Sequence, residues 1–298
     1  MSPTARGILI FLAGGLMFTC MDLMAKLLAE RVHLLQTLWF RYVVQVVIVT
    51  LIILPRFRSV LRTRYPGLQL LRSVFLFAAS AFFFASYLGL ELTENIAIGQ
   101  IAPLWLTLGG ALFLGEKLGR ARLLAVFVGL TGALIIIRPG TEAFTAWGLL
   151  VIAGTLCYAG YALTTRFVGS DEDVWTSLFY APLFAMVILS AAVPFAWQPL
   201  IPSDWPFLIG IGLFGAAGQL FLIRALSLAE AGVLAPFFYA SFLWATLLQL
   251  AVFGLWPDAA TVLGALVIAG AGLYVWHRET RAAKWDSSGR TKAAPPTG

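Results

Sequence analysis

The sequence predicts an all-α integral membrane protein whose ten transmembrane helices form two inverted five-helix repeats around a central cavity. Three observations support this prediction. The residues are 60% hydrophobic and only 11% charged, which leaves too little polar surface for a soluble globule of 298 residues. Ten apolar segments each have about the ~20 residues that a helix needs to cross ~30 Å of hydrocarbon. The last five of these segments repeat the first five about 140 residues later.

The repeat is visible as identical residues at a nearly constant spacing. Matching residues lie 139 or 140 positions apart, and they include Gly14 with Gly154, Phe40 with Phe179, Trp105 with Trp244, Thr107 with Thr246, and Gly115 with Gly254. Because five is an odd number, each half crosses the membrane an odd number of times, and the second half enters from the opposite side. Inverted repeats of this kind are typical of secondary transporters.

The ten segments follow one another with short connections. In chain order they are 7–28, 34–54, 69–90, 95–114, 120–137, 147–167, 174–194, 206–226, 231–254 and 259–277. The first begins with Arg6 as a secretory signal would, but it is too long for a signal core and lacks a small-x-small cleavage site. The chain is therefore divided into a cytoplasmic N-terminus (1–6), a first repeat (7–138), a second repeat (147–278) and a disordered cytoplasmic tail (279–298).

The basic residues predict the orientation. With the N-terminus inside, 16 of the 20 Lys and Arg, Arg72 among them, belong to inward segments, and only Lys26, Arg31, Arg41 and Arg138 lie on the other side. The positive-inside rule then places both termini in the cytoplasm. We expect the protein to reside in the cytoplasmic (inner) membrane. The net charge of +6 reflects this topology, and no nucleic-acid partner is expected.

Polar side chains within five of the spans are candidates for lining a cavity, because a polar group at membrane depth is costly unless it faces the bundle interior. The candidate substrate-binding residues are Ser80, Tyr87, Gln100, Trp105, Thr107, Tyr158, Tyr161, Gln219, Tyr239, Trp244 and Thr246. Hydrogen bonding between helices is the alternative role, and for any single residue it is the commoner one. The repeat pairs Gln100 with Tyr239, which favours a shared site.

Trp105 and Trp244 lie in the middle of their spans, whereas seven other tryptophans lie near span ends. An indole N–H at that depth needs a partner, so these two residues are expected to face protein or a cavity. They are equally interpretable as large packing residues.

The charged residues inside spans suggest one pairing. Asp22 and Arg41 are expected at similar depth, so we hypothesise that Asp22 pairs with Arg41 or with Lys26 one turn away. Small residues at four-residue spacing in the fifth and tenth spans, such as Gly129 and Gly264, predict close packing either within the protomer or in a dimer.

The sequence argues against an enzyme. It has two histidines, His33 and His277, and contains no HExxH, GxSxG or acidic cluster. No catalytic residue, metal ligand or cofactor is therefore expected, and the absence of a GxxxxGK[ST] loop argues against an ATP-driven pump. Cys20 and Cys157 lie inside spans and are interpreted as small apolar fillers.

Several short motifs together resemble the EamA-type drug/metabolite transporters. They are Pro103 in the fourth span, Leu114-Gly115-Glu116 at its end, a glycine-rich fifth span, and Ala235-Pro236-Phe237-Phe238 in the second half. Leu255 departs from the pattern, since an acidic residue is common there. The resemblance implies that helices 1–4 and 6–9 surround a central cavity, with helices 5 and 10 peripheral. It also implies alternating access and export of amino acids, aromatic ones included, or related metabolites.

The predicted function is a secondary transporter that exports small neutral or zwitterionic metabolites, above all amino acids. A cavity lined by Ser, Thr, Gln, Tyr and Trp offers hydrogen bonds and stacking surface but few fixed charges. The expected partners are a small-molecule substrate and the lipid bilayer, and an oligomer through helices 5 and 10 is left open. The alternatives are a channel or a structural membrane subunit.

Overall fold

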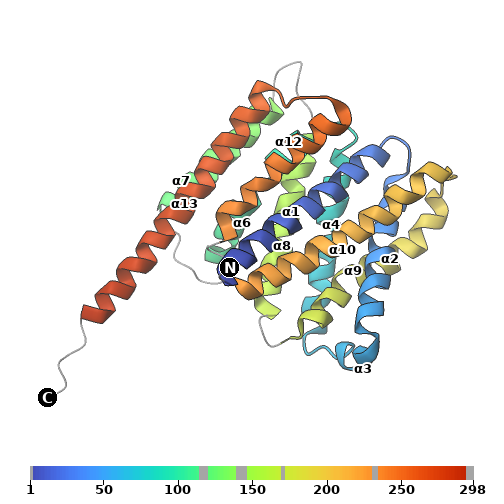
Figure 1. Ribbon diagram of the computed structural model, residues 1–298, viewed down its shortest axis with the longest axis horizontal. Coiled ribbons are helices and arrows are strands. Elements are labelled where there is room, and N and C mark those ends of the chain that lie inside the picture. The colour runs from blue at the N-terminus through green and yellow to red at the C-terminus, as the bar shows by residue number, and fades with distance from the viewer. Residues whose placement is uncertain (1–2, 114–119, 139–145, 169–171, 230–233, 293–298) are drawn as a thin grey trace.

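The computed structural model describes residues 3–113, 120–138, 146–168, 172–229 and 234–292, and the regular structure within these ranges is helical (Figure 1). Helices occupy all ten ranges that the sequence predicts. The α-helices are α1 Pro3–Leu28, α2 Leu34–Ile53, α3 Phe57–Val60, α4 Pro66–Ser86, α5 Leu92–Gly99, α6 Ala102–Phe113, α7 Arg120–Ile137, α8 Trp147–Val168, α9 Val174–Ala192, α10 Trp205–Leu228, α12 Ala240–Phe253 and α13 Ala259–Lys292. A 3-10 helix, η5, covers Ala235–Tyr239.

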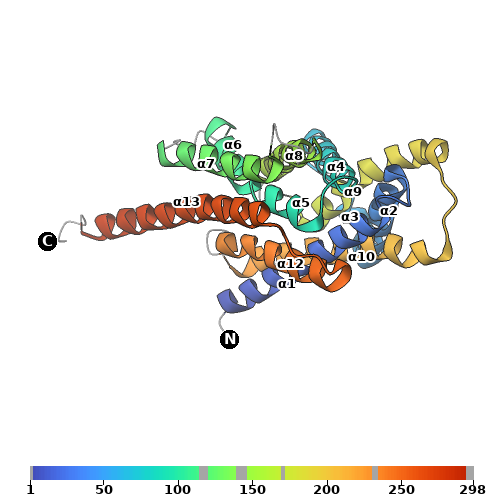
Figure 2. The ribbon, with the colours of Figure 1, turned by 90° about the horizontal axis from the view of Figure 1, so that it is seen from above.

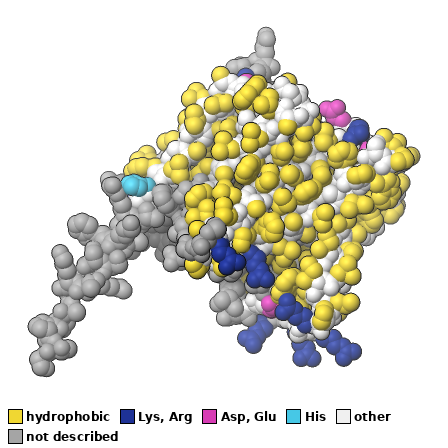
Figure 3. All heavy atoms as spheres, viewed as in Figure 1, with side chains coloured by type: hydrophobic (Ala, Val, Ile, Leu, Met, Phe, Trp, Pro, Cys, Tyr) yellow, Lys and Arg dark blue, Asp and Glu magenta, His cyan; other side chains and the backbone are white. Residues whose placement is uncertain are grey.

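By length and composition, six segments of the described chain are able to cross a membrane. They are Ala5–Leu28, Leu34–Val60, Pro66–Ser86, Trp147–Thr165, Trp175–Ala196 and Pro202–Ala225, and shorter apolar helices cover Leu123–Ile137, Phe237–Phe253 and Ala259–Tyr274. Apolar side chains cover most of the face seen in Figure 3, while Lys and Arg gather at its lower end. We call this end, which carries the exposed Arg56, Arg58, Arg62 and Arg64, the basic end.

Local sequence signals explain where several helices start and stop. His33 precedes α2, and its ring Nδ1 accepts a hydrogen bond from the Leu35 N–H. Asp173 caps α9 in the same way by accepting from the Trp175 N–H. Pro66 opens α4, where its missing N–H costs nothing. Gly254 ends α12 with φ 68°, a left-handed conformation that glycine adopts without strain.

The fourth predicted span is not one continuous helix. It divides into α5 and α6 at Gln100, and in the described part of the ninth span η5 likewise precedes α12, which starts after Tyr239. Pro103 explains the first break, because a proline cannot donate to the carbonyl four residues earlier and its ring clashes with that carbonyl. Pro236 lies in η5. Gln100 and Tyr239 are matched by the repeat, so the two interruptions fall at equivalent positions.

The prediction of a disordered tail from residue 279 is wrong for most of its length, because α13 continues to Lys292. The segment contains Ala, Arg and Lys, which are good helix formers, beside the poorer Asp286-Ser287-Ser288-Gly289, and it has no proline before Pro295. Extending an existing helix needs no new nucleus, so a polar continuation of this composition remains helical. The last residues, 293–298, lie outside the described ranges.

The helices pack in pairs that run side by side. Helix α1 packs on α10, α4 on α8, α2 on α9, and α7 on α13. Figures 1 and 2 show the α7 and α13 pair at one side of the bundle. Their contact is close, since a Cβ added to Gly264 would lie 2.5 Å from the carbonyl oxygen of Gly132. The small residues of the fifth and tenth predicted spans therefore pack against each other within the chain.

Candidate substrate site

A stripe of polar side chains runs along one buried face of α2. Thr37, Arg41 and Gln45 are spaced four residues apart, so they share a helix face and follow one another at steps of about 6 Å. All three are buried, although they belong to a helix of strongly apolar composition. This stripe provides a polar line through the bundle from the end opposite the basic end.

Near Gln45 the stripe joins a hydrogen-bond network between four helices. The Gln45 side-chain amide donates to Gln219 Oε1 at 2.6 Å, and the Gln219 amide donates to the Tyr161 hydroxyl at 3.1 Å. The guanidinium of Arg72 donates to the same hydroxyl at 3.1 Å. Helices α2, α10, α8 and α4 are thus linked, and both sequence repeats contribute to the network.

In the sequence, Arg72 follows the exposed arginines of the basic end. In the structure it does not lie among them. It is only 4% exposed, and its guanidinium lies over the Tyr161 ring at 5.0 Å. Gln69 accepts a second hydrogen bond from it at 3.5 Å. Among the described residues, no carboxylate lies within 4.0 Å of Arg72. A buried cation that has only neutral partners is costly in a membrane protein, which is typical of a functional position.

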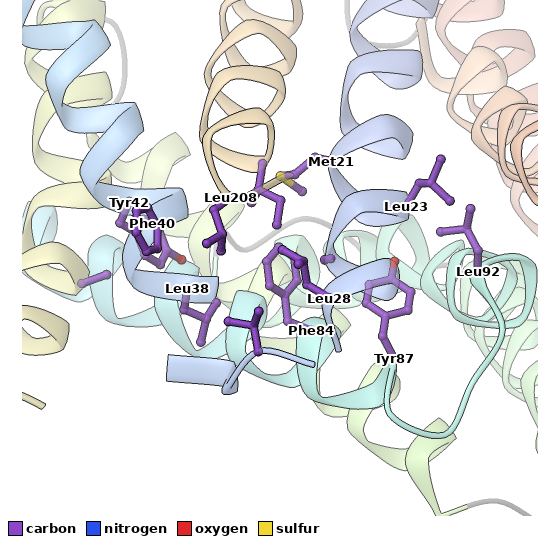
Figure 4. Packing of buried hydrophobic residues seen from close by; sticks show 14 of the residues in the cluster. Met21, Leu23, Leu28, Leu38, Phe40, Tyr42, Phe84, Tyr87, Leu92 and Leu208 are labelled. Atoms are coloured by element: carbon purple, nitrogen blue, oxygen red, sulfur yellow. The ribbon is translucent and has the colours of Figure 1, made fainter. Parts of the chain in front are cut away.

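In the middle of the stripe, Arg41 lies against two aromatic rings. Its guanidinium is 5.2 Å from the ring centroids of both Tyr42 and Phe84. Asp22 is within electrostatic reach of Arg41 and forms a side-chain hydrogen bond with Tyr87. Figure 4 shows Phe84 and Tyr87 side by side, with the Tyr87 hydroxyl directed toward α1.

The two cations proposed as partners of Asp22 make no direct ion pair with it, and Arg41 acts on it at longer range. In the described part of the chain, neither Arg41 nor Lys26 approaches its carboxylate within 4.0 Å. Lys26 instead donates to the backbone carbonyl of Tyr87 at 2.8 Å. The lysine binds at the end of α4 because the last carbonyl groups of that helix have no hydrogen-bond partner within the helix.

The two mid-span tryptophans occupy equivalent positions with different partners. The Trp105 indole N–H donates to the Thr155 hydroxyl at 3.0 Å. Trp244 lies against Gly15, the repeat equivalent of Thr155, where a Cβ would be 3.9 Å from the indole nitrogen. The Trp244 N–H is buried and has no hydrogen-bond partner. The tryptophan contact occurs in both halves of the chain, but only the indole of Trp105 makes a hydrogen bond there.

We expect two substitutions at this contact to act in opposite directions. Thr155→Val removes the acceptor of a buried indole N–H and is expected to destabilise the protein by about 1–3 kcal/mol. Gly15→Ser supplies a hydroxyl that accepts from the Trp244 indole N–H, and it is expected to stabilise the protein by about 1 kcal/mol. Melting temperatures of the detergent-purified variants measure both effects.

Gly15→Ala is the control for this pair, because it changes helix propensity without adding a hydroxyl. A Gly15→Ser variant no more stable than Gly15→Ala would contradict the assignment.

The remaining predicted residues do not converge on one cluster. Gln100 donates to Ser241 at 2.6 Å across the two halves, and its carbonyl oxygen is buried without a partner. Ser80 and Thr246 donate to carbonyls of their own helices, at 2.8 and 2.9 Å. Ser80 also accepts from the Tyr42 hydroxyl at 2.7 Å, which is the interhelical role that the sequence left open.

Three further candidates have different positions. The Tyr158 ring lies 6.0 Å from the Tyr161 ring and so borders the network. The Tyr239 hydroxyl points at Gly272 of α13, where the absence of a side chain leaves space for it. The side chain of Thr107 lies outside the described part of the structure.

The chain matches the model of the EamA-like transporter family twice, over residues 5–138 and 145–276. It belongs to this family. It is 30% identical to a riboflavin transporter of Vibrio cholerae over 284 residues, which cover 93% of this chain and 94% of the relative. An S-adenosylmethionine uptake transporter of Rickettsia felis is 24% identical, with 88% and 89% covered. A pseudopaline exporter of Pseudomonas aeruginosa is also 24% identical, with 88% and 93% covered.

These matches confirm the resemblance that the motifs predicted. The two matched segments agree with the two repeats that the residue spacing defines. The family member described here is thus a multi-pass membrane protein and a small-molecule transporter. The names of the three relatives give three different solutes, and two of the names give opposite directions, uptake and export.

Proposed function

We propose that this EamA family member is a secondary transporter whose ten membrane-crossing segments form two oppositely oriented halves, residues 7–138 and 147–278. It exports neutral and zwitterionic metabolites, above all amino acids including aromatic ones, by alternating access. The basic end faces the cytoplasm, as the positive-inside rule requires of its arginines. Both termini are then cytoplasmic, in the inner membrane. A dimer through α7 and α13 is not part of the proposal, because their small residues already pack together.

The observation that carries the proposal is a set of contacts that recur between the halves. A Cβ at Gly14 would lie 3.4 Å from the Gly218 carbonyl oxygen, and one at Gly154 would lie 3.4 Å from that of Ala79. Gly154 lies 140 positions after Gly14, and Gly218 lies 139 positions after Ala79, so each contact is the repeat equivalent of the other. The contact of Gly7 with Ala229 and that of Gly89 with Trp147 are equivalent too. Trp147 lies 140 positions after Gly7, and Ala229 lies 140 positions after Gly89. Repetition of tertiary contacts indicates an internal two-fold relation between the halves.

The directions of equivalent helices support an inverted relation. Helices α2 and α9 are counterparts in the repeat. Trp39 near the start of α2 contacts Ser190 near the end of α9, and Phe57 after the end of α2 contacts Phe179 near the start of α9, so the two helices are antiparallel. Helices α7 and α13 are also counterparts, and Arg138 after the end of α7 forms an ion pair with Asp258 before the start of α13. Counterpart helices that run in opposite directions are expected when the two halves have inverted topology.

Two features favour small polar solutes with an apolar part. The polar stripe of α2 and the network around Tyr161 provide hydrogen-bond partners, and the nearby rings of Tyr42, Phe84 and Tyr158 provide stacking surface. Gln100 lies at the interruption between α5 and α6, and interrupted helices are where transporters commonly hold their solutes. Trp244 adds a buried N–H without a partner.

Uptake into liposomes tests the function. The purified protein is expected to give saturable transport of labelled tryptophan or threonine that unlabelled amino acids inhibit. A proton gradient of either sign shows whether transport is coupled to protons. Absence of transport for every amino acid would refute the proposed solutes while leaving the family assignment in place. Transport that never saturates would instead favour a channel.

A further inference from the structure

A pocket of about 260 Å³ opens at the end of the bundle opposite the basic end. The connection from α1 to α2 forms its rim with Glu30, Arg31 and His33, while Thr37 and Phe84 lie deeper. Thr37 is 4% exposed and its hydroxyl has no hydrogen-bond partner. A polar group that is buried at a pocket wall and left unsatisfied indicates a surface that a ligand or water completes.

Arg41 lies directly below this pocket. It is one turn below Thr37 on the same face of α2, and its guanidinium contacts the ring of Phe84, which lines the pocket. Arg41 is 8% exposed and its Nε has no acceptor. On the α10 side, Gly215 faces this guanidinium, since a Cβ there would lie 4.0 Å from Nε and 3.1 Å from the sulfur of Met21. The guanidinium is therefore held by aromatic rings, with no carboxylate within ion-pair distance among the described residues.

Asp22 supplies the opposite charge within electrostatic reach of Arg41. It lies three residues before Ala25, a pocket residue on the same side of α1. Tyr87 is its hydrogen-bond partner, and the separation from Arg41 exceeds the 4.0 Å of an ion pair. Arg41 and Asp22 therefore interact electrostatically without a direct ion pair between them. A solute that carries both charges compensates them together.

We propose that Arg41 and Asp22 form the recognition site for a zwitterionic α-amino acid, reached through the pocket beside Phe84. The solute carboxylate binds the Arg41 guanidinium, and its α-ammonium group binds Asp22. Phe84 and Tyr42, whose rings flank Arg41, are placed to contact an apolar side chain. This inference rests on the proposed amino-acid function and specifies the groups by which the solute is selected.

A ligand series with the unmodified protein tests the inference. Inhibition of labelled tryptophan uptake is compared for tryptophan, tryptophanamide, which lacks the carboxylate, and indole-3-propionate, which lacks the ammonium group. Both analogues are expected to inhibit at least tenfold more weakly than tryptophan, because each leaves one buried charge without its partner. Equal inhibition by all three ligands would overturn the inference but not the transport function.

Two variants assign the charges. Arg41→Gln is expected to abolish the preference for tryptophan over tryptophanamide while keeping the preference over indole-3-propionate. Asp22→Asn is expected to abolish the preference for tryptophan over indole-3-propionate while keeping the preference over tryptophanamide. Arg62→Gln, which removes an exposed cation at the basic end, is the control and is expected to keep both preferences. A merely structural role of Arg41 or Asp22 would lower uptake without exchanging these preferences, and that result would overturn the assignment.

Failure of the variants to fold does not remove the test, since the ligand series needs only the natural sequence. If neither tryptophan nor any other amino acid is transported, the amino-acid function fails and this inference fails with it. If tryptophan is transported without discrimination against the two analogues, only the inference fails.

Discussion

Replacing Gly264 by leucine is expected to lower the melting temperature of the purified protein by roughly 5 °C or more. A Cβ at this position would lie 2.5 Å from both the carbonyl oxygen of Gly132 and Cγ1 of Ile136. Helices α7 and α13 would have to separate, and overpacking of this kind costs about 1–3 kcal/mol. In a membrane, close contact of small residues is a main source of helix association, so the loss is not recovered elsewhere.

Gly270→Leu is the matched control on the same helix. Nothing lies within 4 Å of a Cβ at Gly270, and the residue is exposed on the outside of the bundle. We expect its melting temperature to stay within about 2 °C of the unmodified protein. Equal destabilisation by the two substitutions would contradict the packing of α7 on α13.

Replacing Tyr161 by phenylalanine is expected to reduce the initial rate of solute transport about tenfold or more. The Tyr161 hydroxyl accepts hydrogen bonds from both Arg72 and Gln219, each at 3.1 Å. Without it, a buried guanidinium keeps only the 3.5 Å contact to Gln69. A hydrogen bond to a charged group contributes about 1.5–3 kcal/mol, and losing about 1.4 kcal/mol of it from the rate-limiting state of transport slows the rate tenfold. The measurement is uptake of labelled solute, with the amount of folded protein held equal.

Tyr274→Phe removes a tyrosine hydroxyl from an exposed residue of α13 and serves as the control. Its transport rate is expected to equal that of the unmodified protein. A Tyr161→Phe variant that transports normally would show that the network around Arg72 only holds helices together, and it would remove Tyr161 and Gln219 from the candidate site.

Much of the fold follows from the sequence because hydrophobic length and the repeat are properties of the chain itself. All ten predicted ranges contain helices, and the repeat correctly pairs Gly14 with Gly154 and Trp105 with Trp244 in equivalent contacts. Pro103 and Pro236 mark these two helices as able to bend, but the sequence does not show that they are interrupted at Gln100 and Tyr239. Proline is often tolerated within membrane helices, so Pro103 alone does not show whether a helix bends, breaks or continues.

The candidate site was predicted less completely, since side-chain partners depend on how distant helices meet. Tyr161 and Gln219 were found by their polarity, but their partners Gln45 and Arg72 were missed. Arg72 follows four surface arginines in sequence and was grouped with them. The four-residue spacing of Thr37, Arg41 and Gln45 was a readable signal on one face of a helix.

Other predicted residues illustrate the reverse problem. Ser80 and Thr246 have the right polarity and depth, yet each donates to a carbonyl of its own helix. A hydroxyl satisfied four residues earlier looks the same in a sequence as one that faces a cavity. Residue type and depth alone therefore overestimate the number of residues that contact a solute.

Counterflow is the measurement that tests most directly whether two halves expose one site alternately. Liposomes containing the protein are loaded with unlabelled tryptophan and diluted into a trace of labelled tryptophan. An alternating-access transporter is predicted to accumulate the label transiently above its outside concentration, because exchange through one shared site is faster than net efflux. Label that only equilibrates, without an overshoot, would contradict the account and indicate a channel.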